Sequence, residues 1–167
     1  MGGVGTKTAV LRLTDDGLQF EATTGSGHTM VLDDGARDSG ARPAELLGVA
    51  LAACTAMDVI SILRKKRQPV TGYEIRVSGH QIPEQPHAFT RFDVVHVVDG
   101  TGVDPEAVRR SVELSATKYC SVGSTLASGM LEIHHSYLLR DADGSEHTGD
   151  VVVCGPLLPP DQPVEGA

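Results

Sequence analysis

One apolar stretch constrains the fold of this chain more than any other feature, residues 43–68, which read PAELLGVALAACTAMDVISILRKKRQ. Pro43 suits the first position of a helix, because the first backbone N–H groups of a helix have no intrahelical partner. Glu45 puts negative charge in the first turn and residues 64–67 put positive charge in the last, as the helix dipole favours. Pro69 follows and cannot continue the helix. The stretch therefore predicts a long helix, apolar on nearly all sides and buried on most of them.

A membrane span is the alternative for this stretch, because basic residues follow an apolar run of about the required length. Asp58 argues against a span, since a charged carboxylate near the centre of a bilayer costs roughly 2.5–3.5 kcal/mol. Glycine and alanine are also frequent in the run, and such small residues let another backbone approach closely. We therefore expect a core helix of a soluble protein.

Composition sets further limits. With 167 residues, 40% of them hydrophobic, the chain can form one domain with a substantial core. The net charge of −8 argues against nucleic acid or an anionic membrane as the main partner. The first residues are too polar for a secretion signal, and three widely spaced cysteines do not suggest a disulfide framework or a zinc site. We expect a cytoplasmic protein with free thiols and no bound metal.

Alternating apolar residues predict strands on both sides of the central helix. They cover residues 6–14, 18–22, 29–32, 73–77, 89–98 and 131–139, and residues 151–154 can add an edge strand. The run Asp104-Pro105-Glu106 predicts the start of a second helix that continues to about Tyr119. Ser121 predicts the cap of a short third helix that ends at Gly129. This order of elements predicts an α+β fold with a mostly antiparallel sheet.

The predicted elements also suggest a domain organisation and an assembly. We expect one domain over residues 1–140, followed by a polar and then proline-rich extension over residues 141–167 that is partly disordered. One small sheet cannot cover a long helix that is apolar all round. A second copy of the chain is the natural cover, so we expect a homodimer.

Two cysteines are the candidates for chemistry. Cys54 lies in the middle of the central helix and Cys120 at the start of a predicted helix. A helix N-terminus lowers the pKa of a thiol, so Cys120 is expected to ionise more readily, whereas apolar neighbours raise the pKa of Cys54 unless a cation reaches it. From composition alone, two ordinary buried cysteines are the simpler interpretation. The sequence predicts no chemical role for Cys154.

The segments around these two cysteines resemble a known family. The runs PAELLGVALAAC, AMDVISIL and KYCSVGSTL resemble the motifs of the OsmC/Ohr family of thiol-dependent hydroperoxide reductases. The resemblance covers the element order from about residue 6 to residue 140, and its specificity rests on the two cysteine motifs together. It implies an OsmC-like fold, in which an antiparallel sheet and a long buried central helix form an intertwined homodimer with active sites at the subunit interface.

The resemblance also implies a two-cysteine mechanism. Cys54 matches the thiolate that attacks an organic hydroperoxide and becomes a sulfenic acid. Cys120 matches the resolving thiol that forms a disulfide with it, and an external dithiol of the lipoyl type then reduces this disulfide. No bound cofactor is needed. The other function that stays open is a non-catalytic protein of the same fold, which binds a small apolar ligand or senses redox state.

A thiolate at Cys54 needs a nearby cation, and at this point the chain departs from the family. Peroxide-reducing relatives carry a glutamate ten residues before the cysteine, which holds an arginine, but this chain has Ala44 there. Glu45 is the nearest acid, yet at about 100° per residue it lies on the opposite side of the helix from the thiol. Arg37, in the loop before the helix, is a candidate for the arginine.

Asp58 follows Cys54 by one helical turn, so the two side chains share a face of the helix. The simpler interpretation is a structural acid that is hydrogen-bonded or paired with a base. In the functional interpretation, its carboxylate holds an arginine or lysine near the sulfur; without such a partner it raises the pKa of the thiol. Among the histidines, His96 is isolated, and His134 and His135 lie on opposite faces of a predicted strand, so they are interpreted as surface or satisfied core residues rather than as metal ligands.

Overall fold

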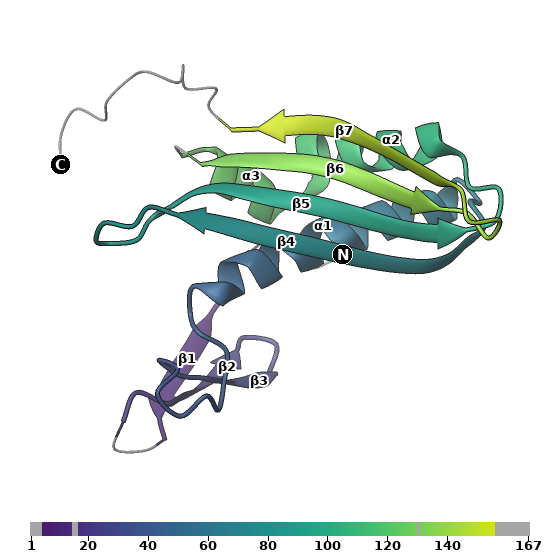
Figure 1. The fold of residues 1–167 in the computed structure, drawn as a ribbon. Helices are drawn as coiled ribbons and strands as arrows, with labels where there is room; N and C mark the ends of the chain where they lie inside the picture. The colour runs from purple at the N-terminus through teal and green to yellow at the C-terminus, as the bar shows by residue number, and fades with distance from the viewer. Residues whose placement is uncertain (1–4, 15–16, 130, 156–167) are drawn as a thin grey trace. The chain divides into compact units, whose positions relative to one another are not determined.

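The computed structural model describes residues 5–14, 17–129 and 131–155, and the chain forms two compact units that divide after Leu47. The N-terminal unit holds a three-stranded antiparallel sheet in the order β1–β2–β3 (Figure 1), formed by Ala9–Leu13, Phe20–Thr24 and Thr29–Leu32. These strands confirm the three that alternation predicts, although Leu18 lies outside β2 and is exposed. The turn predicted at residues 15–17 lies partly outside the described residues.

Helix α1 spans Glu45–Lys65 and confirms the predicted central helix, although the sequence predicts it to continue to Gln68. The helix ends early because the backbone of Arg67 turns left-handed, with φ of 54°. The N–H of Gln68 then donates to the carbonyl of Leu63 at 3.0 Å, and that of Arg67 to Arg64 at 2.9 Å. This is the usual closing pattern of a helix, with arginine at a position that glycine most often occupies.

Only one face of α1 is buried within a single chain. Its buried residues recur every fourth position: Leu51, Thr55, Val59 and Leu63. On the opposite face Val49 is 59% and Met57 is 69% exposed, so a single chain leaves this face uncovered, and burial of the helix on most sides stays a prediction about the assembly. One sheet can cover only one side of a helix. By length and hydropathy α1 could cross a membrane, but core helices pass the same test, and its buried stripe packs inside the protein.

The C-terminal unit is built on a four-stranded sheet in the order β4–β5–β6–β7, formed by Val70–Gln81, Phe89–Gly100, Glu132–Arg140 and Glu146–Cys154. The β5–β6 pair is parallel and the other pairs are antiparallel, which confirms an α+β fold with mostly antiparallel sheets. Strand β7 is longer than predicted and lies inside the predicted C-terminal extension. The disorder predicted for the last residues concerns 156–167, which lie outside the described residues.

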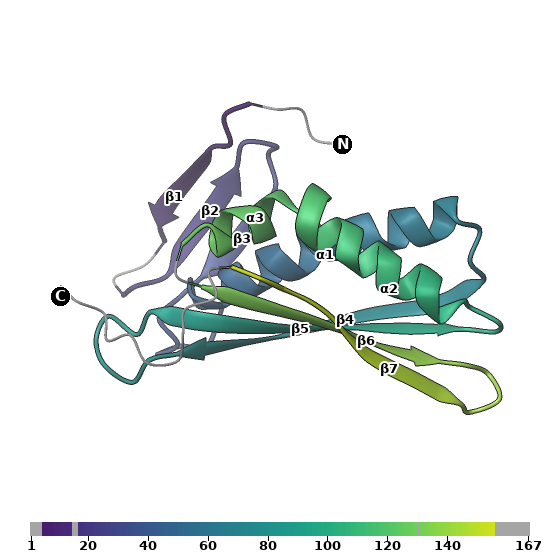
Figure 2. The same cartoon turned by 90° about the horizontal axis from the view of Figure 1, so that it is seen from above.

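Three helical segments lie on the same face of this sheet (Figures 1 and 2): the part of α1 from Gly48 onward, α2 over Pro105–Leu114 and α3 over Ser121–Ala127. The start of α2 is as predicted, because the Asp104 carboxylate accepts the N–H of Glu106 at 3.0 Å. The helical segment ends at Tyr119, as predicted, but its last turn is not α-helical. A wider π-helical turn, η1, covers Ser115–Tyr119 instead.

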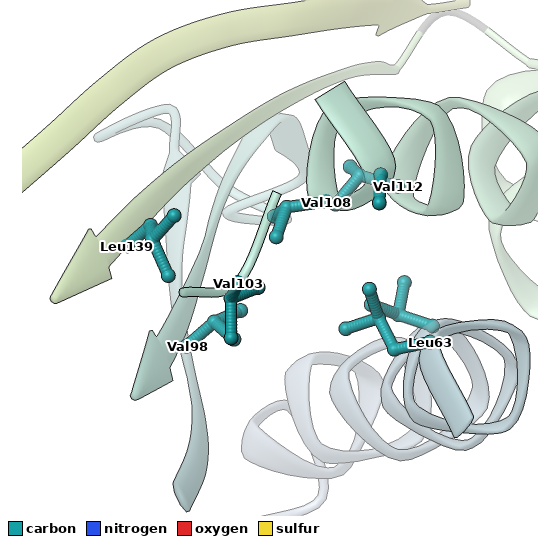
Figure 3. Close-up of a cluster of buried hydrophobic side chains, with 8 residues drawn as sticks. Leu63, Val98, Val103, Val108, Val112 and Leu139 are labelled. Atoms are coloured by element: carbon teal, nitrogen blue, oxygen red, sulfur yellow. The ribbon is translucent and has the colours of Figure 1, made fainter. Parts of the chain in front are cut away.

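Two apolar clusters fill the space between the sheet and the helices. The first joins α1, α2 and the sheet (Figure 3), with inward-pointing side chains that include Leu63, Val98, Val108, Val112 and Leu139. The second lies toward the other end of the sheet and consists of Leu51, Phe92, Val94, Cys120 and Ile133. A buried cysteine is therefore part of the packed core, and this second cluster positions the candidate site.

Candidate functional site

The structure brings Cys54 and Cys120 together within one copy of the chain. Cys120 is only 3% exposed and belongs to the second apolar cluster, and Cys54 is half-buried and packs against that cluster. The Cys54 thiol lies close enough to raise the pKa of the Cys120 thiol, and neither cysteine is in a disulfide. The resemblance implies a cysteine pair at a subunit interface, whereas the sulfur contact itself needs only one subunit.

The π-helical turn η1 sets the position of Cys120. The N–H of Cys120 donates to the carbonyl of Ser115 at 2.9 Å, five residues back, so the chain makes one wide turn just before the thiol. The Cys120 sulfur then accepts the N–H of Gly123 at 3.2 Å and caps α3. The prediction that Ser121 caps this helix is wrong, because the thiol one residue earlier provides the acceptor. A side chain at position 123 would press on this sulfur, since a Cβ there would lie 3.3 Å from it.

Burial raises the pKa of the Cys120 thiol to about 12. The Cys54 thiol raises this pKa as well, and the N–H of Gly123 lowers it only in part. The prediction that Cys120 ionises readily at a helix start is therefore wrong, because the loss of water outweighs one amide dipole. Cys120 stays a protonated thiol near neutral pH, which suits a group that waits for an oxidised partner.

A buried polar network links the two cysteine-bearing segments. The Ser115 hydroxyl donates to the Asp58 carboxylate at 3.2 Å and lies 2.9 Å from the Thr55 hydroxyl. Ser115 and Thr55 are fully buried, and partial burial raises the pKa of Asp58. Asp58 is thus hydrogen-bonded, as the simpler interpretation of this acid expects. Ser115 begins η1, so the network ties the Cys54 region of α1 to the turn that carries Cys120.

The other two predicted site residues belong to the N-terminal unit. The Glu45 carboxylate accepts the backbone N–H of Arg42 at 2.9 Å and so caps α1. Arg37 is exposed in the loop after β3. A catalytic role for either residue stays a prediction. In the described part of the C-terminal unit, the groups that most affect the pKa of Cys120 are Cys54, Gly123 and Asp58, none of them basic.

The third cysteine also lies at this end of the core, which the sequence gives no reason to expect. Cys154 is half-buried at the end of β7 and packs against the cluster that contains Cys120. Its thiol donates to the carbonyl of Ala116, inside η1, at 3.6 Å. Cys154 and Cys120 line one cavity of about 400 Å³, together with Ala116, Thr117, Lys118, Ser124, Ala127 and Ser128.

Two of the histidines form a buried group elsewhere between the sheet and the helices. His96 and His135 are 0% and 4% exposed, and their rings stack with centroids 5.9 Å apart. His96 Nδ1 lies 2.5 Å from the Tyr73 hydroxyl. His96 Nε2 and His135 Nδ1 have no hydrogen-bond partner among the described residues, so the interpretation as surface or satisfied core histidines is wrong for these two.

A half-buried thiol on a long apolar helix, packed beside a buried thiol that caps a second helix, defines a class: α+β proteins with a paired-cysteine site. Within this class the chain belongs to the OsmC-like protein family, whose sequence profile matches residues 35–134. The match includes both cysteines and confirms the family that the motifs suggest.

Relatives support this assignment. The chain is 38% identical to Protein YhfA of Escherichia coli K12 over 122 residues, which is 73% of this chain and 90% of that protein. A hypothetical protein from Aquifex aeolicus is similar in structure, with a TM-score of 0.72, 27% identity, and coverage of 83% of this chain and 98% of that one. The organic hydroperoxide resistance protein OhrB of Bacillus subtilis shares the fold, with a TM-score of 0.54, 16% identity, and coverage of 83% and 100%.

Proposed function

We propose that this protein reduces organic hydroperoxides with Cys54 as the attacking thiol and Cys120 as the resolving thiol, as part of an oxidative stress response. The observation that carries the proposal is that Cys54 packs against the apolar cluster that contains Cys120, close enough to raise the pKa of that thiol. One thiol is half-buried and can meet a substrate, and the other is almost fully buried. This division of roles matches the needs of a two-step thiol reaction.

The proposed cycle has three steps. The Cys54 sulfur attacks the distal peroxide oxygen, so that the O–O bond breaks, an S–O bond forms and the alkoxide takes a proton to leave as an alcohol. The Cys120 sulfur then attacks the resulting sulfenic acid, an S–S bond forms, and the hydroxyl leaves with the Cys120 proton as water. An external dithiol finally reduces the disulfide by two successive exchanges.

The family supports this proposal, since some proteins of the same fold are named for organic hydroperoxide resistance. At 14–16% identity these likenesses concern the fold alone. A cytoplasmic location would suit the cycle, because cytosolic reductants keep thiols reduced. Roles for Arg37 and Glu45 in activating the thiol stay predictions from the sequence, and the proposed role of Asp58 is to hold η1 in place through Ser115.

We also propose that the protein works as a homodimer, with a second copy on the exposed face of α1. Three apolar residues follow each other at four-residue spacing on this face: Val49, Ala53 and Met57. They lie opposite the buried stripe and continue the apolar character of the helix. A partner subunit would remove this surface from water and could bring a basic side chain to Cys54.

Met57→Asp is expected to convert the dimer into a monomer. Burying a methionine contributes about 1.5–3 kcal/mol, and a carboxylate in its place must be desolvated, so the dissociation constant should rise at least about 100-fold. Sedimentation velocity at several protein concentrations measures this change. Val153→Asp, at an exposed position of β7, is the matched control. Equal dimer content in both variants would reject α1 as the interface.

The proposed reaction is tested by titrating reduced protein with cumene hydroperoxide. One equivalent should consume two thiols and release one equivalent of cumyl alcohol. Trypsin separates the cysteines into residues 38–64, 119–140 and 141–167, so mass spectrometry can identify the oxidised ones. The first thiol lost should be Cys54. If hydroperoxide consumes no thiol of the folded protein, the non-catalytic function stands instead, either the binding of a small apolar ligand or redox sensing.

A further inference from the structure

We infer that Cys154 is a third redox thiol, which attacks the Cys54–Cys120 disulfide at Cys120 and so frees Cys54. This inference rests on the proposed function. Its starting point is that the described part of the chain places all three cysteines at one cluster, with Cys120 as its buried member and Cys54 and Cys154 packed against it.

The geometry places Cys154 on another side of Cys120 from Cys54. The cavity of about 400 Å³ is lined by Cys120 and Cys154, and Cys54 is not among its lining residues. The Cys154 thiol is held toward η1 by the Ala116 carbonyl at 3.6 Å, one turn before Cys120. The carbonyl of Ser115, next to it, accepts the N–H of Cys120 at 2.9 Å. The Cys154 thiol and the Cys120 backbone are therefore held by the same π-helical turn, and both cysteines line the same cavity.

The inferred step is a thiol–disulfide exchange and needs no additional oxidant. The Cys154 thiolate attacks the sulfur of Cys120, an S–S bond forms between them, and the Cys54–Cys120 bond breaks. Cys54 leaves as a thiolate, and the proton lost from Cys154 balances it. The number of electrons is unchanged, because one disulfide replaces another.

The exchange would separate the site that reacts with peroxide from the site that meets the reductant. Cys54 on α1 becomes available for another hydroperoxide, while the oxidising equivalent is stored beside the cavity. Lys118, Ser124 and Ser128 give this cavity a polar wall, and its volume accommodates a small dithiol. Cys154 would then be the first sulfur that the external dithiol meets.

Disulfide mapping after one equivalent of cumene hydroperoxide tests the inference. In the full-length wild-type protein, peptides 119–140 and 141–167 should be linked in most molecules, and iodoacetamide should still label Cys54. In Cys154→Ser the link should move to peptides 38–64 and 119–140, and Cys54 should lose its labelling. Val153→Ser changes the neighbouring, exposed residue and should behave as wild type. A 38–64 to 119–140 link in wild type, with Cys154 fully labelled, would overturn the inference.

A second arm needs no peroxide and therefore separates this inference from the proposed function. In Cys54→Ser, diamide accepts two electrons and two protons and should oxidise the remaining thiols to a Cys120–Cys154 disulfide. If this pair forms but hydroperoxide oxidises no thiol in wild type, the proposed function fails while the thiol contact stands. If diamide leaves both thiols free in the folded variant, Cys154 is too far from Cys120 and the inference fails alone.

Discussion

Cys54→Ser is expected to lower hydroperoxide consumption to the rate without protein, a loss of at least about 10³-fold or about 4 kcal/mol in the activation barrier. A serine hydroxyl is a far weaker nucleophile than a thiol at neutral pH, and it has no sulfur to accept the oxygen. The measurement is the loss of cumene hydroperoxide with dithiothreitol as the reductant. The substitution removes no large group from the core, since Cys54 is only half-buried.

Cys120→Ser is the matched variant, and its expected behaviour is different. The first oxidation at Cys54 should proceed, but without a resolving thiol the sulfenic acid should persist and react with dimedone. One equivalent of hydroperoxide should then consume one thiol instead of two. If Cys54→Ser retained turnover while Cys120→Ser lost the first oxidation, the assignment of the two roles would be reversed.

Sequence reasoning succeeds here where the structural signal is local. The start of α2 follows from Asp104 and Pro105, because an N-cap acid and a proline at the first position act within one turn. The start of α1 follows in the same way. The Glu45 carboxylate caps it by accepting the backbone N–H of Arg42, three residues earlier. The strands follow from alternation, which shows where a strand runs but not which neighbour it pairs with.

The candidate site depends on contacts that no local pattern encodes. Ser115 continues the buried face of the second predicted helix, but its bond to Asp58 joins two distant segments. The wide turn η1 places Cys120 where its own sulfur caps α3, and a sequence offers Ser121 as the more usual cap. The pKa of Cys120 then depends on burial, which the fold decides, so reasoning from the helix end alone gives the wrong direction.

The long helix shows a different limit. Its apolar residues surround the axis, so the sequence correctly predicts that it needs cover, but cannot say which molecule provides it. Within one chain the sheet covers the stripe from Leu51 to Leu63, and Met57 stays exposed. Strand β7 shows a similar limit. It pairs with β6 over nearly its whole length, but only its last residues are apolar, so the sequence predicts only that end of the strand.

Acid is expected to destabilise this fold between about pH 6.5 and pH 4, because two buried histidines must gain protons on unfolding. Burial, together with the charge of His135, lowers the pKa of His96 to about 3. Burial, together with His134, lowers the pKa of His135 to about 4. Both values lie below the ordinary value of 6.5, so at pH 5 the unfolded chain binds protons that the folded chain does not.

The sign and size of the effect follow from this difference. Wherever the unfolded state binds more protons than the folded state, lowering the pH lowers the free energy of unfolding. The limiting slope is about 1.4 kcal/mol per pH unit for each histidine. Below pH 6.5 the two histidines together should therefore lower the free energy of unfolding by about 3 kcal/mol per pH unit. Their contribution to stability is fully present only above pH 6.5. Urea unfolding from pH 6.5 to pH 5, at one fixed protein concentration, isolates this range, because ordinary carboxylates titrate lower.

His135→Phe provides the decisive comparison. Phenylalanine keeps an aromatic ring against His96 and removes Nδ1, which is buried without a partner among the described residues. The variant should be equal to wild type or up to about 1 kcal/mol more stable at pH 7, and should lose roughly half of the pH slope. His147→Gln, at an exposed position of β7, should keep the wild-type slope. An unchanged slope in His135→Phe would mean that water or a proton reaches this histidine in the folded protein, and the buried pair would not be the origin of acid sensitivity.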